Sequence, residues 1–312
     1  MVRLVIDTDP GVDDAHAIMA ALAFPGTAVE ALTTVVGNVS LAHTTTNACR
    51  ILDAMDADVP VYRGCARPLI APPSNASAFH GEDGLGDSES GPVARRTEDE
   101  HAVQALIRLV NEAPGDLTLL AIGPLTNLAL AVRLAPDLPS KIAKLVVMGG
   151  AIRGMGNATP ATEYNFRGDP EAAAIVFEAW PMLTLVSWET TLAHAFTPQQ
   201  VDALLAIDTP RADFFRRVTA KTFDFIERFT GERRMFEPDL LAAAVALDPT
   251  IVRAAESHYV QIELAGDNTR GQSTVDWFDR VSSGRPGTAP NCEVVLEVDT
   301  RRVFDMMRAA LE

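Results

Sequence analysis

Short runs of valine, leucine and isoleucine alternate with stretches of helical periodicity along most of the chain. Such apolar runs occur at 4–6, 29–36, 117–122, 142–148 and 183–188. Helical patterns lie between them, at 14–24, 41–55, 98–112 and 127–134. Uninterrupted apolar strands separated by helices are typical of a parallel sheet that is buried on both faces. The sequence therefore predicts an α/β fold, Rossmann-like in outline, with a mostly parallel central sheet flanked by helices.

The length favours a single domain. The chain has 312 residues, and 47% of them are hydrophobic, so a large core can form. We find no internal repeat and no linker, and we expect one domain over 1–312. Two stretches rich in glycine, serine and proline, 66–97 and 266–291, are expected to be loops, whereas 199–236 has a helical pattern.

Charge and cysteine content restrict the partners and the compartment. The net charge of −16 argues against nucleic acid and anionic membranes but not against a neutral small molecule. The three cysteines are far apart and form no CxxC pair, which fits a reducing compartment. No apolar run reaches the roughly 18 residues of a membrane helix, and the N-terminus does not have the pattern of a signal peptide. We therefore expect a cytoplasmic protein without membrane partners.

Four carboxylates follow the first apolar run, in "LVIDTDPGVDDAHAI": Asp7, Asp9, Asp13 and Asp14. Because the carboxyl ends of parallel strands share one edge, Asn38 and two further glycine-containing turns should meet them there. A solvated acidic loop is one explanation, and an aspartyl-phosphate loop is another, although Gly11 breaks its pattern. A hard divalent cation such as Ca²⁺ is the third. An EF-hand is excluded by the spacing, so a cation here would need another carboxylate from far along the chain.

Several segments carry a family resemblance. "DTDPGVDDAHAI" resembles the N-terminal signature of the inosine–uridine-preferring nucleoside hydrolases. "TTVVGNVSL", "FHGEDGLG", "AIGPLTNLALA", "VVMGGA", "GNATPATEYNFRGDPEAA" and "PDLLAAAVALDP" are similar to later family segments in the same order, as are "RGQSTVDW" and "NCEVVLEVDTRRVFDMM". The resemblance covers nearly the whole chain and implies an enzyme that cleaves the N-glycosidic bond of ribonucleosides with water and holds one Ca²⁺.

The resemblance also implies roles for individual residues around the cation. Asp9, Asp14 and Asp239 would be metal ligands together with the backbone carbonyl of Ile122, and Asp7 would orient this network. Asp9 would also be the general base that takes a proton from a Ca²⁺-bound water. The carboxylates would stabilise the oxocarbenium-like ribose of the transition state.

The same resemblance implies contacts with a small-molecule ribonucleoside. The residues expected to bind the ribose are Asp13, Asn38, Asn157, Glu163, Asn165 and Asp239, with Met148 and Phe166 packed nearby. His80 is expected near the nucleobase. His16, His43, His194 and His258 are interpreted as structural. Trp188 and Trp277 could line a pocket, but core packing is the preferred interpretation. Family members are usually homodimers or homotetramers, so a homo-oligomer is expected.

The sequence departs from the family where the base should leave. Many members carry a histidine before the distant aspartate, but Pro238 precedes Asp239 here, and residues 211–236 contain no tyrosine. Glu232, Arg233 or His80 could take over the role, and we expect an altered base preference. A non-catalytic, Ca²⁺-dependent nucleoside- or ribose-binding protein is the main alternative. A dinucleotide enzyme is disfavoured, because "GMGNAT" lacks the third glycine of GxGxxG.

Overall fold

An eight-stranded sheet forms the centre of the computed structural model, which describes residues 1–88, 93–280 and 289–312. The strand order is β3-β2-β1-β4-β5-β6-β10-β7, and only the pairing of β10 with β7 is antiparallel. The strands are β1 Val2–Thr8, β2 Thr27–Thr34, β3 Val61–Arg63, β4 Leu117–Ala121, β5 Lys144–Met148, β6 Leu183–Val186, β7 Val252–His258 and β10 Cys292–Val298. A separate pair comprises β8 Val260–Ile262 and β9 Ser273–Val275. The predicted α/β class with a mostly parallel sheet is confirmed.

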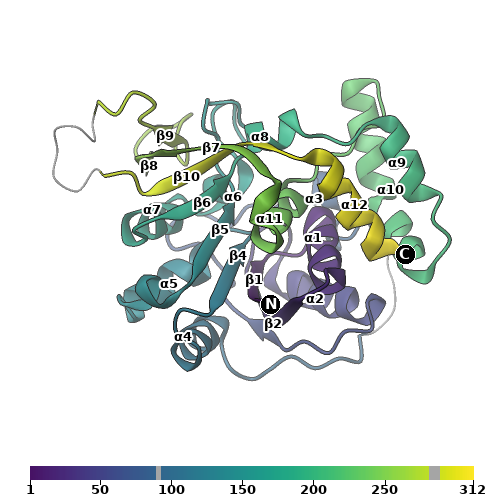
Figure 1. Ribbon diagram of the computed structural model, residues 1–312, viewed down its shortest axis with the longest axis horizontal. Coiled ribbons are helices and arrows are strands. Elements are labelled where there is room, and N and C mark those ends of the chain that lie inside the picture. Colours follow the sequence, from purple (N-terminus) through teal and green to yellow (C-terminus); the bar gives the residue numbers. More distant parts are fainter. Residues whose placement is uncertain (89–92, 281–288) are drawn as a thin grey trace.

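Helices cover both faces of the sheet (Figure 1). One hydrophobic cluster lies with α1 Val12–Ala23, α2 Leu41–Ala54, α10 Pro210–Thr230, α11 Pro238–Leu247 and α12 Thr300–Leu311. A second cluster lies with α4 Ala102–Glu112, α5 Thr126–Leu134 and α7 Pro170–Ala179. The remaining helices are α3 Ser77–His80, α6 Tyr164–Gly168, α8 Trp188–Ala193 and α9 Pro198–Leu205, with short 3-10 turns at Leu138–Lys141 and Pro249–Ile251. Residues from both strand faces enter these clusters, which is why the strand sequences are almost wholly apolar.

The predicted loops and helices need three corrections. The stretch 66–97 contains the short helix α3, and 266–291 contains strand β9. The helical pattern at 199–236 is interrupted between α9 and α10, where Pro210 begins a new helix. The parts of the predicted loops at 89–92 and 281–288 lie outside the described residues. Among those that are described, no helix combines the length and apolar character needed to cross a membrane.

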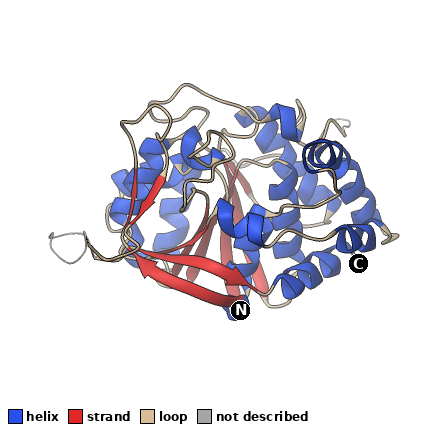
Figure 2. Ribbon diagram, turned by 90° about the horizontal axis from the view of Figure 1, so that it is seen from above, coloured by secondary structure: helices blue, strands red, loops and turns tan. Residues whose placement is uncertain are grey.

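Parallel pairing brings the strand ends to one edge (Figure 2). In the register of the sheet, Thr8 of β1 pairs with Thr34 of β2, and Asp7 pairs with Ala121 of β4. The backbone amide of Ile122 continues this ladder by donating to the carbonyl of Asp7 over 2.9 Å. The segments that leave β1, β2 and β4 therefore start side by side, as the strand-end rule predicts.

Candidate active site

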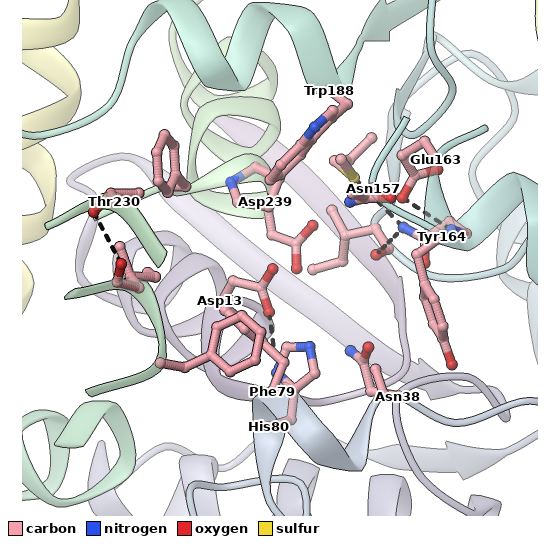
Figure 3. A pocket seen from close by; sticks show the side chains of 18 residues that line it. Asp13, Asn38, Phe79, His80, Asn157, Glu163, Tyr164, Trp188, Thr230 and Asp239 are labelled. Carbon is pink, nitrogen blue, oxygen red and sulfur yellow. Dashed lines mark hydrogen bonds and ion pairs between the residues drawn. The ribbon is translucent and has the colours of Figure 1, made fainter. Parts of the chain in front are cut away.

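A cavity of about 330 Å³ opens at the carboxyl edge of the sheet (Figure 3). Its lining contains nine of the predicted site residues, most of them polar, together with Tyr164, which was not predicted. The predicted ones are Asp13, Asn38, His80, Ile122, Met148, Asn157, Glu163, Asn165 and Asp239. The rest of the lining is mostly apolar and comes from Ala76, Phe79, Trp188, Phe225, Ile226, Thr230, Phe236 and Pro238. The cavity thus has a carboxylate end and an aromatic end.

Asp9 is held tightly beside this cavity. Its Oδ2 accepts a hydrogen bond from the backbone amide of Asn38 at 2.7 Å, and its Oδ1 is buried without a hydrogen-bond partner among the described residues. Two glycines make room for the carboxylate: a Cβ on Gly37 would lie 1.9 Å from Oδ2, and one on Gly123 would lie 2.5 Å from Oδ1. Burial, together with the charges of Asp14 and Asp13, raises the pKa of Asp9 well above its usual range.

Asp14 connects the end of β1 to the start of α1. Its Oδ1 accepts from the Thr8 hydroxyl at 2.5 Å, and its Oδ2 accepts from the Gly11 amide at 2.8 Å and from Asn38 Nδ2 at 3.0 Å. A carboxylate at a helix N-terminus is favoured by the helix dipole and by the free amides. Burial and the nearby charge of Asp13 raise the pKa of Asp14 to about 6.

Asp7 lies one layer deeper, within the sheet. Its Oδ2 accepts from the hydroxyl of Thr33 at 2.6 Å and from Asn127 Nδ2 at 2.8 Å, whereas Oδ1 is buried and unpaired in the described part of the chain. Asn127 also binds the backbone through Nδ2 to Thr34 and through Oδ1 to the amide of Cys65. Asp7 therefore braces the strand ends beneath the cavity and is not among its lining residues.

Three carboxylates approach closely enough to share a cation. Oxygens of Asp13, Asp14 and Asp239 all lie within 4.8 Å of one another, and Asp13 faces Asp239 across the cavity (Figure 3). Burial, and then the charges of Asp13, Asp14, Asp9 and finally Glu237, raise the pKa of Asp239 well above its usual range. The group contains the predicted ligands Asp14 and Asp239, but it has Asp13 where the sequence predicted Asp9.

These donors fit a hard cation. All of them are oxygens, the ligand type that Ca²⁺ and Mg²⁺ prefer. Oδ1 of Asp9 and Oδ1 of Asp13 are buried without hydrogen-bond partners in the described residues, so they have unsatisfied acceptor capacity. A positive ion would satisfy these oxygens and offset the repulsion between the carboxylates. The acidic cluster can therefore hold a metal ion.

The predicted ribose ligands surround the cavity at its carboxylate end. Asn165 donates from Nδ2 to the carbonyl of Ile122 at 3.0 Å and contacts Met148 Sδ at 3.4 Å. Glu163 caps α6: its carboxylate accepts from the amides of Gly150, Asn165 and Phe166. Burial raises the pKa of Glu163 to about 7.

Three further residues that were predicted at the site, Asn38, Asn157 and Phe166, differ in how far they are exposed. Asn38 is buried, and Nδ2 also donates to the carbonyl of Asp9 at 3.2 Å. Asn157 is exposed at the mouth of the cavity. Phe166 is fully buried and packs edge to face on Phe177, with ring centroids 5.6 Å apart, so it supports the site from within the core.

His80 lies between the carboxylate end and the aromatic end. The backbone amide of Val12, at the start of α1, donates to His80 Nδ1 at 3.2 Å. Because Nδ1 accepts this bond, the proton of the neutral ring is on Nε2, which faces the cavity (Figure 3). Burial lowers the pKa of His80 to about 4 even though the charge of Asp14 opposes the shift, so the ring is neutral at neutral pH.

The aromatic end was largely missed by the sequence analysis. Phe79 stacks edge to face on Phe225 with centroids 5.4 Å apart, and Trp188 packs on Phe236 at 6.2 Å. Trp188, for which the sequence left a pocket open but favoured the core, does both: its half-buried ring packs against the core and also lines the cavity. It begins α8 just past the carboxyl end of β6, so the strand-end rule could have found it.

Two candidates for assisting the leaving base are not at the cavity. Glu232 pairs with Arg234, and Arg233 lies 3.7 Å from Asp202; neither contributes to the described cavity lining. Pro238 lines the cavity with its ring, beside Asp239. Of the three candidates raised by the sequence, only His80 faces the cavity.

Similarity to known proteins agrees with this geometry. The family model for inosine-uridine preferring nucleoside hydrolases matches residues 4–305. The chain belongs to this family. The non-specific ribonucleoside hydrolase RihC of Salmonella enteritidis PT4 is 35% identical over 297 residues, which covers 95% of this chain and 93% of that protein.

Solved structures of nucleoside hydrolases have the same fold. An inosine-guanosine nucleoside hydrolase is 35% identical with a TM-score of 0.92, and covers 100% of this chain and 99% of its own. A plant nucleoside hydrolase, PpNRh1, is 31% identical with a TM-score of 0.93, over 99% and 98% of the two chains. This member of the family is therefore an N-glycosidase whose substrate is a ribonucleoside.

Proposed function

We propose that this nucleoside hydrolase is Ca²⁺-dependent and uses Asp9 as its general base. The observation that carries the proposal is the unpaired, buried Oδ1 of Asp9 beside the cluster of Asp13, Asp14 and Asp239. We assign the cation to Asp9, Asp14, Asp239 and the carbonyl of Ile122. When bound, a hard cation holds a water and lowers its pKa, which is the chemistry it supplies to hydrolases.

Asp9 then has two tasks in the proposal: it binds the cation, and it acts as the general base. Its Oδ1 takes a proton from the attacking water, while the amide of Asn38 keeps Oδ2 in place. A buried, oriented base needs no reorganisation when the bond breaks. As the glycosidic bond lengthens, the ribose becomes oxocarbenium-like, and the surrounding carboxylates stabilise its positive charge.

We assign the ribose to the carboxylate end of the cavity. Asn38, Asn157, Glu163 and Asn165 offer the mixture of donors and acceptors that sugar hydroxyls require, and Asp13 and Asp239 add carboxylate acceptors. With the sugar there, the base extends into the aromatic end. Rings stack on either a purine or a pyrimidine, so this part of the site favours nucleobases in general.

For the departing base, we assign His80 as a hydrogen-bond donor. Its Nε2 proton faces the cavity, and Nδ1 is occupied by the amide of Val12. A neutral imidazole held at a helix N-terminus can stabilise developing negative charge without itself ionising. This role would replace the histidine that many family members have where Pro238 stands.

The proposal also covers the cellular compartment and the oligomeric state. We propose a cytoplasmic enzyme, supported by three buried cysteines that are all free thiols. We also propose a homodimer or homotetramer, which family resemblance alone supports. Membership of a hydrolase family leaves the non-catalytic nucleoside-binding alternative without support.

The test is release of reducing sugar from a panel of purine, pyrimidine and modified ribonucleosides. Protein depleted of metal by a chelator is assayed alone, with Ca²⁺ and with Mg²⁺, beside an Asp9→Asn variant. We expect ribose only from the wild-type protein, lost on chelation and restored best by Ca²⁺. Full activity after chelation would refute the metal assignment, and full activity of the Asp9 variant would refute the base.

A further inference from the structure

A buried histidine–carboxylate pair connects the two helices that carry the acidic cluster. His16 Nδ1 lies 3.0 Å and 3.1 Å from the two carboxylate oxygens of Glu237, although the residues are 221 positions apart. His16 is 1% exposed and Glu237 is 3% exposed. The pair is therefore shielded from water. In such an environment a hydrogen bond depends strongly on its direction and on the length of the side chains that form it.

The pair lies directly beside the acidic residues in sequence. His16 is on α1, two positions after Asp14, and Glu237 is two positions before Asp239 on α11. Glu237 occupies the N-cap position of α11, but its side chain does not cap that helix and binds His16 instead. A hydrogen bond between His16 and Glu237 therefore joins α1 to the start of α11, close to the carboxylates of both helices.

Aromatic residues from several segments lie around the pair. The ring of Phe215 lies 4.9 Å from the ring of His16. Phe79 and Phe236, which line the aromatic end of the main cavity, also line a small void next to His16 and Glu237. His16 Nε2 has no hydrogen-bond partner in the described residues, so Glu237 provides the polar contact that orients this ring.

We infer that His16 and Glu237 are positioning residues that hold the carboxylates of α1 and α11 at the spacing a cation requires. This inference rests on the proposed cation site. Partners that orient metal ligands commonly account for 10- to 100-fold in metal affinity. In this chain the orientation acts through the helices: His16 fixes α1 near Asp14, and Glu237 fixes the first turn of α11 near Asp239.

Two conservative variants separate positioning from simple attraction of the cation. Glu237→Gln keeps the length and the acceptor oxygen but removes the charge. Glu237→Asp keeps the charge but shortens the reach to His16, and aspartate at an N-cap can bond the amides of its own helix. Positioning predicts that the Gln variant behaves like wild type and that the Asp variant does not. Attraction by charge predicts the reverse.

The experiment measures Ca²⁺ affinity by calorimetry on metal-free full-length protein. We expect the Kd to rise about 10- to 100-fold in Glu237→Asp, Glu237→Ala and His16→Ala, and less than about 3-fold in Glu237→Gln. The double variant His16→Ala/Glu237→Ala should bind no more weakly than either single variant, because both changes remove one interaction. Kinetics should show the same order, with kcat restored at saturating Ca²⁺.

A control variant tests whether loss of any histidine–carboxylate pair would weaken Ca²⁺ binding. His258 pairs with the exposed Glu256 at 2.9 Å within the edge strand β7, so His258→Ala removes a histidine–carboxylate pair away from the cavity and should leave the Kd unchanged. Equal affinities for all Glu237 variants, or weakening in Glu237→Gln as great as in Glu237→Ala, would overturn the inference, as would absence of Ca²⁺ binding in the wild type. If Ca²⁺ binding follows the expected order but the wild type releases no ribose, the proposed function fails and the positioning role stands.

Discussion

The two ends of the cavity are built in different ways. The carboxylate end takes its acids from the turn after β1 and from the first turns of α1 and α11. Hydrogen bonds from buried donors hold Asp9 and Asp14 there. The aromatic end is assembled from rings on separate segments, which contact in two pairs, Phe79 with Phe225 and Trp188 with Phe236. One end is fixed by directional bonds, and the other by packing.

This difference suggests a division of labour. Directional bonds to buried acceptors tolerate little displacement, which suits groups that must meet a cation, a water and the reacting carbon. Packed rings accept different nucleobases, because every base has a flat face on which a ring can stack. We therefore expect changes at the carboxylate end to reduce kcat, and changes at the aromatic end to alter KM and base preference.

The largest effect is expected from the base itself. Asp9→Asn removes the proton acceptor while keeping the size of the side chain and the contact with the Asn38 amide. We predict that kcat falls by about 10³-fold or more, since a positioned general base contributes up to about 10⁴-fold. Steady-state ribose release measures it, with the exposed Asp58→Asn as control. A fall of less than tenfold would show that another group takes the proton.

The second prediction tests how closely Asp9 must be held. A methyl group on Gly37 would lie 1.9 Å from Asp9 Oδ2, so Gly37→Ala must displace the carboxylate. We predict about a 10²-fold loss of kcat and weaker Ca²⁺ binding, as is typical of a displacement near 1 Å. Gly168→Ala is the matched control, because its Cβ would meet only Pro124 at an ordinary 3.5 Å. Wild-type kinetics in Gly37→Ala would contradict the rigid placement.

At the aromatic end the expected effect is smaller, and it concerns substrate binding rather than the chemical step. Trp188→Ala removes a ring from the cavity wall, and base–aromatic stacking is worth about 1–3 kcal/mol. We predict that KM rises about 5- to 150-fold, with kcat reduced far less and with the ranking of nucleosides altered. Trp277→Ala, which packs on His258 instead, should leave KM unchanged. A loss confined to kcat would mean that Trp188 acts on the chemical step.

The last prediction concerns stability and pH rather than catalysis. Burial raises the pKa of Asp7 and of Glu163 to about 7, above the unfolded values near 4. Each group binds its proton more tightly in the folded state, so its stabilisation is present at low pH and is lost as the pH rises from about 4 to 7. Metal-free protein should therefore be less stable at pH 7.5 than at pH 5, by on the order of 3 kcal/mol per group. Urea unfolding at both pH values measures this difference.

Asp7→Asn is the variant that sharpens the pH prediction. An amide at this position cannot ionise, so the loss of stability between pH 5 and pH 7.5 should be smaller than in the wild type. The hydroxyl of Thr33 and Nδ2 of Asn127 can still donate to its oxygen. An unchanged dependence on pH would place the titrating groups elsewhere.

Much of the fold follows from local sequence. The predicted strands and helices of the N-terminal half agree with the structure to within a few residues, because continuous apolar runs and capping residues determine them. Helix α3 and strand β9 were not predicted, since each has only a few residues within a stretch rich in glycine and serine. Such short elements form through contacts with the rest of the molecule and leave little local pattern.

The site, too, could be predicted from the sequence only in part. The acids and asparagines were visible because a charged or amide side chain at a buried strand end demands an explanation. For Trp188 the sequence could not decide between pocket and core, because a ring that lines a cavity and a ring in the core have the same sequence pattern. The pairing of His16 with Glu237 was also beyond prediction, because 221 residues separate them and neither belongs to a motif that names the other.

The most direct test of the account is a crystal structure of the protein with Ca²⁺, the ion located by its anomalous scattering. We predict one ion at the carboxylate end, coordinated by Asp9, Asp14, Asp239 and the carbonyl of Ile122, with water or substrate completing its shell. An ion held among Asp13, Asp14 and Asp239 and remote from Asp9 would contradict the account, because the proposed base would then be separated from the metal.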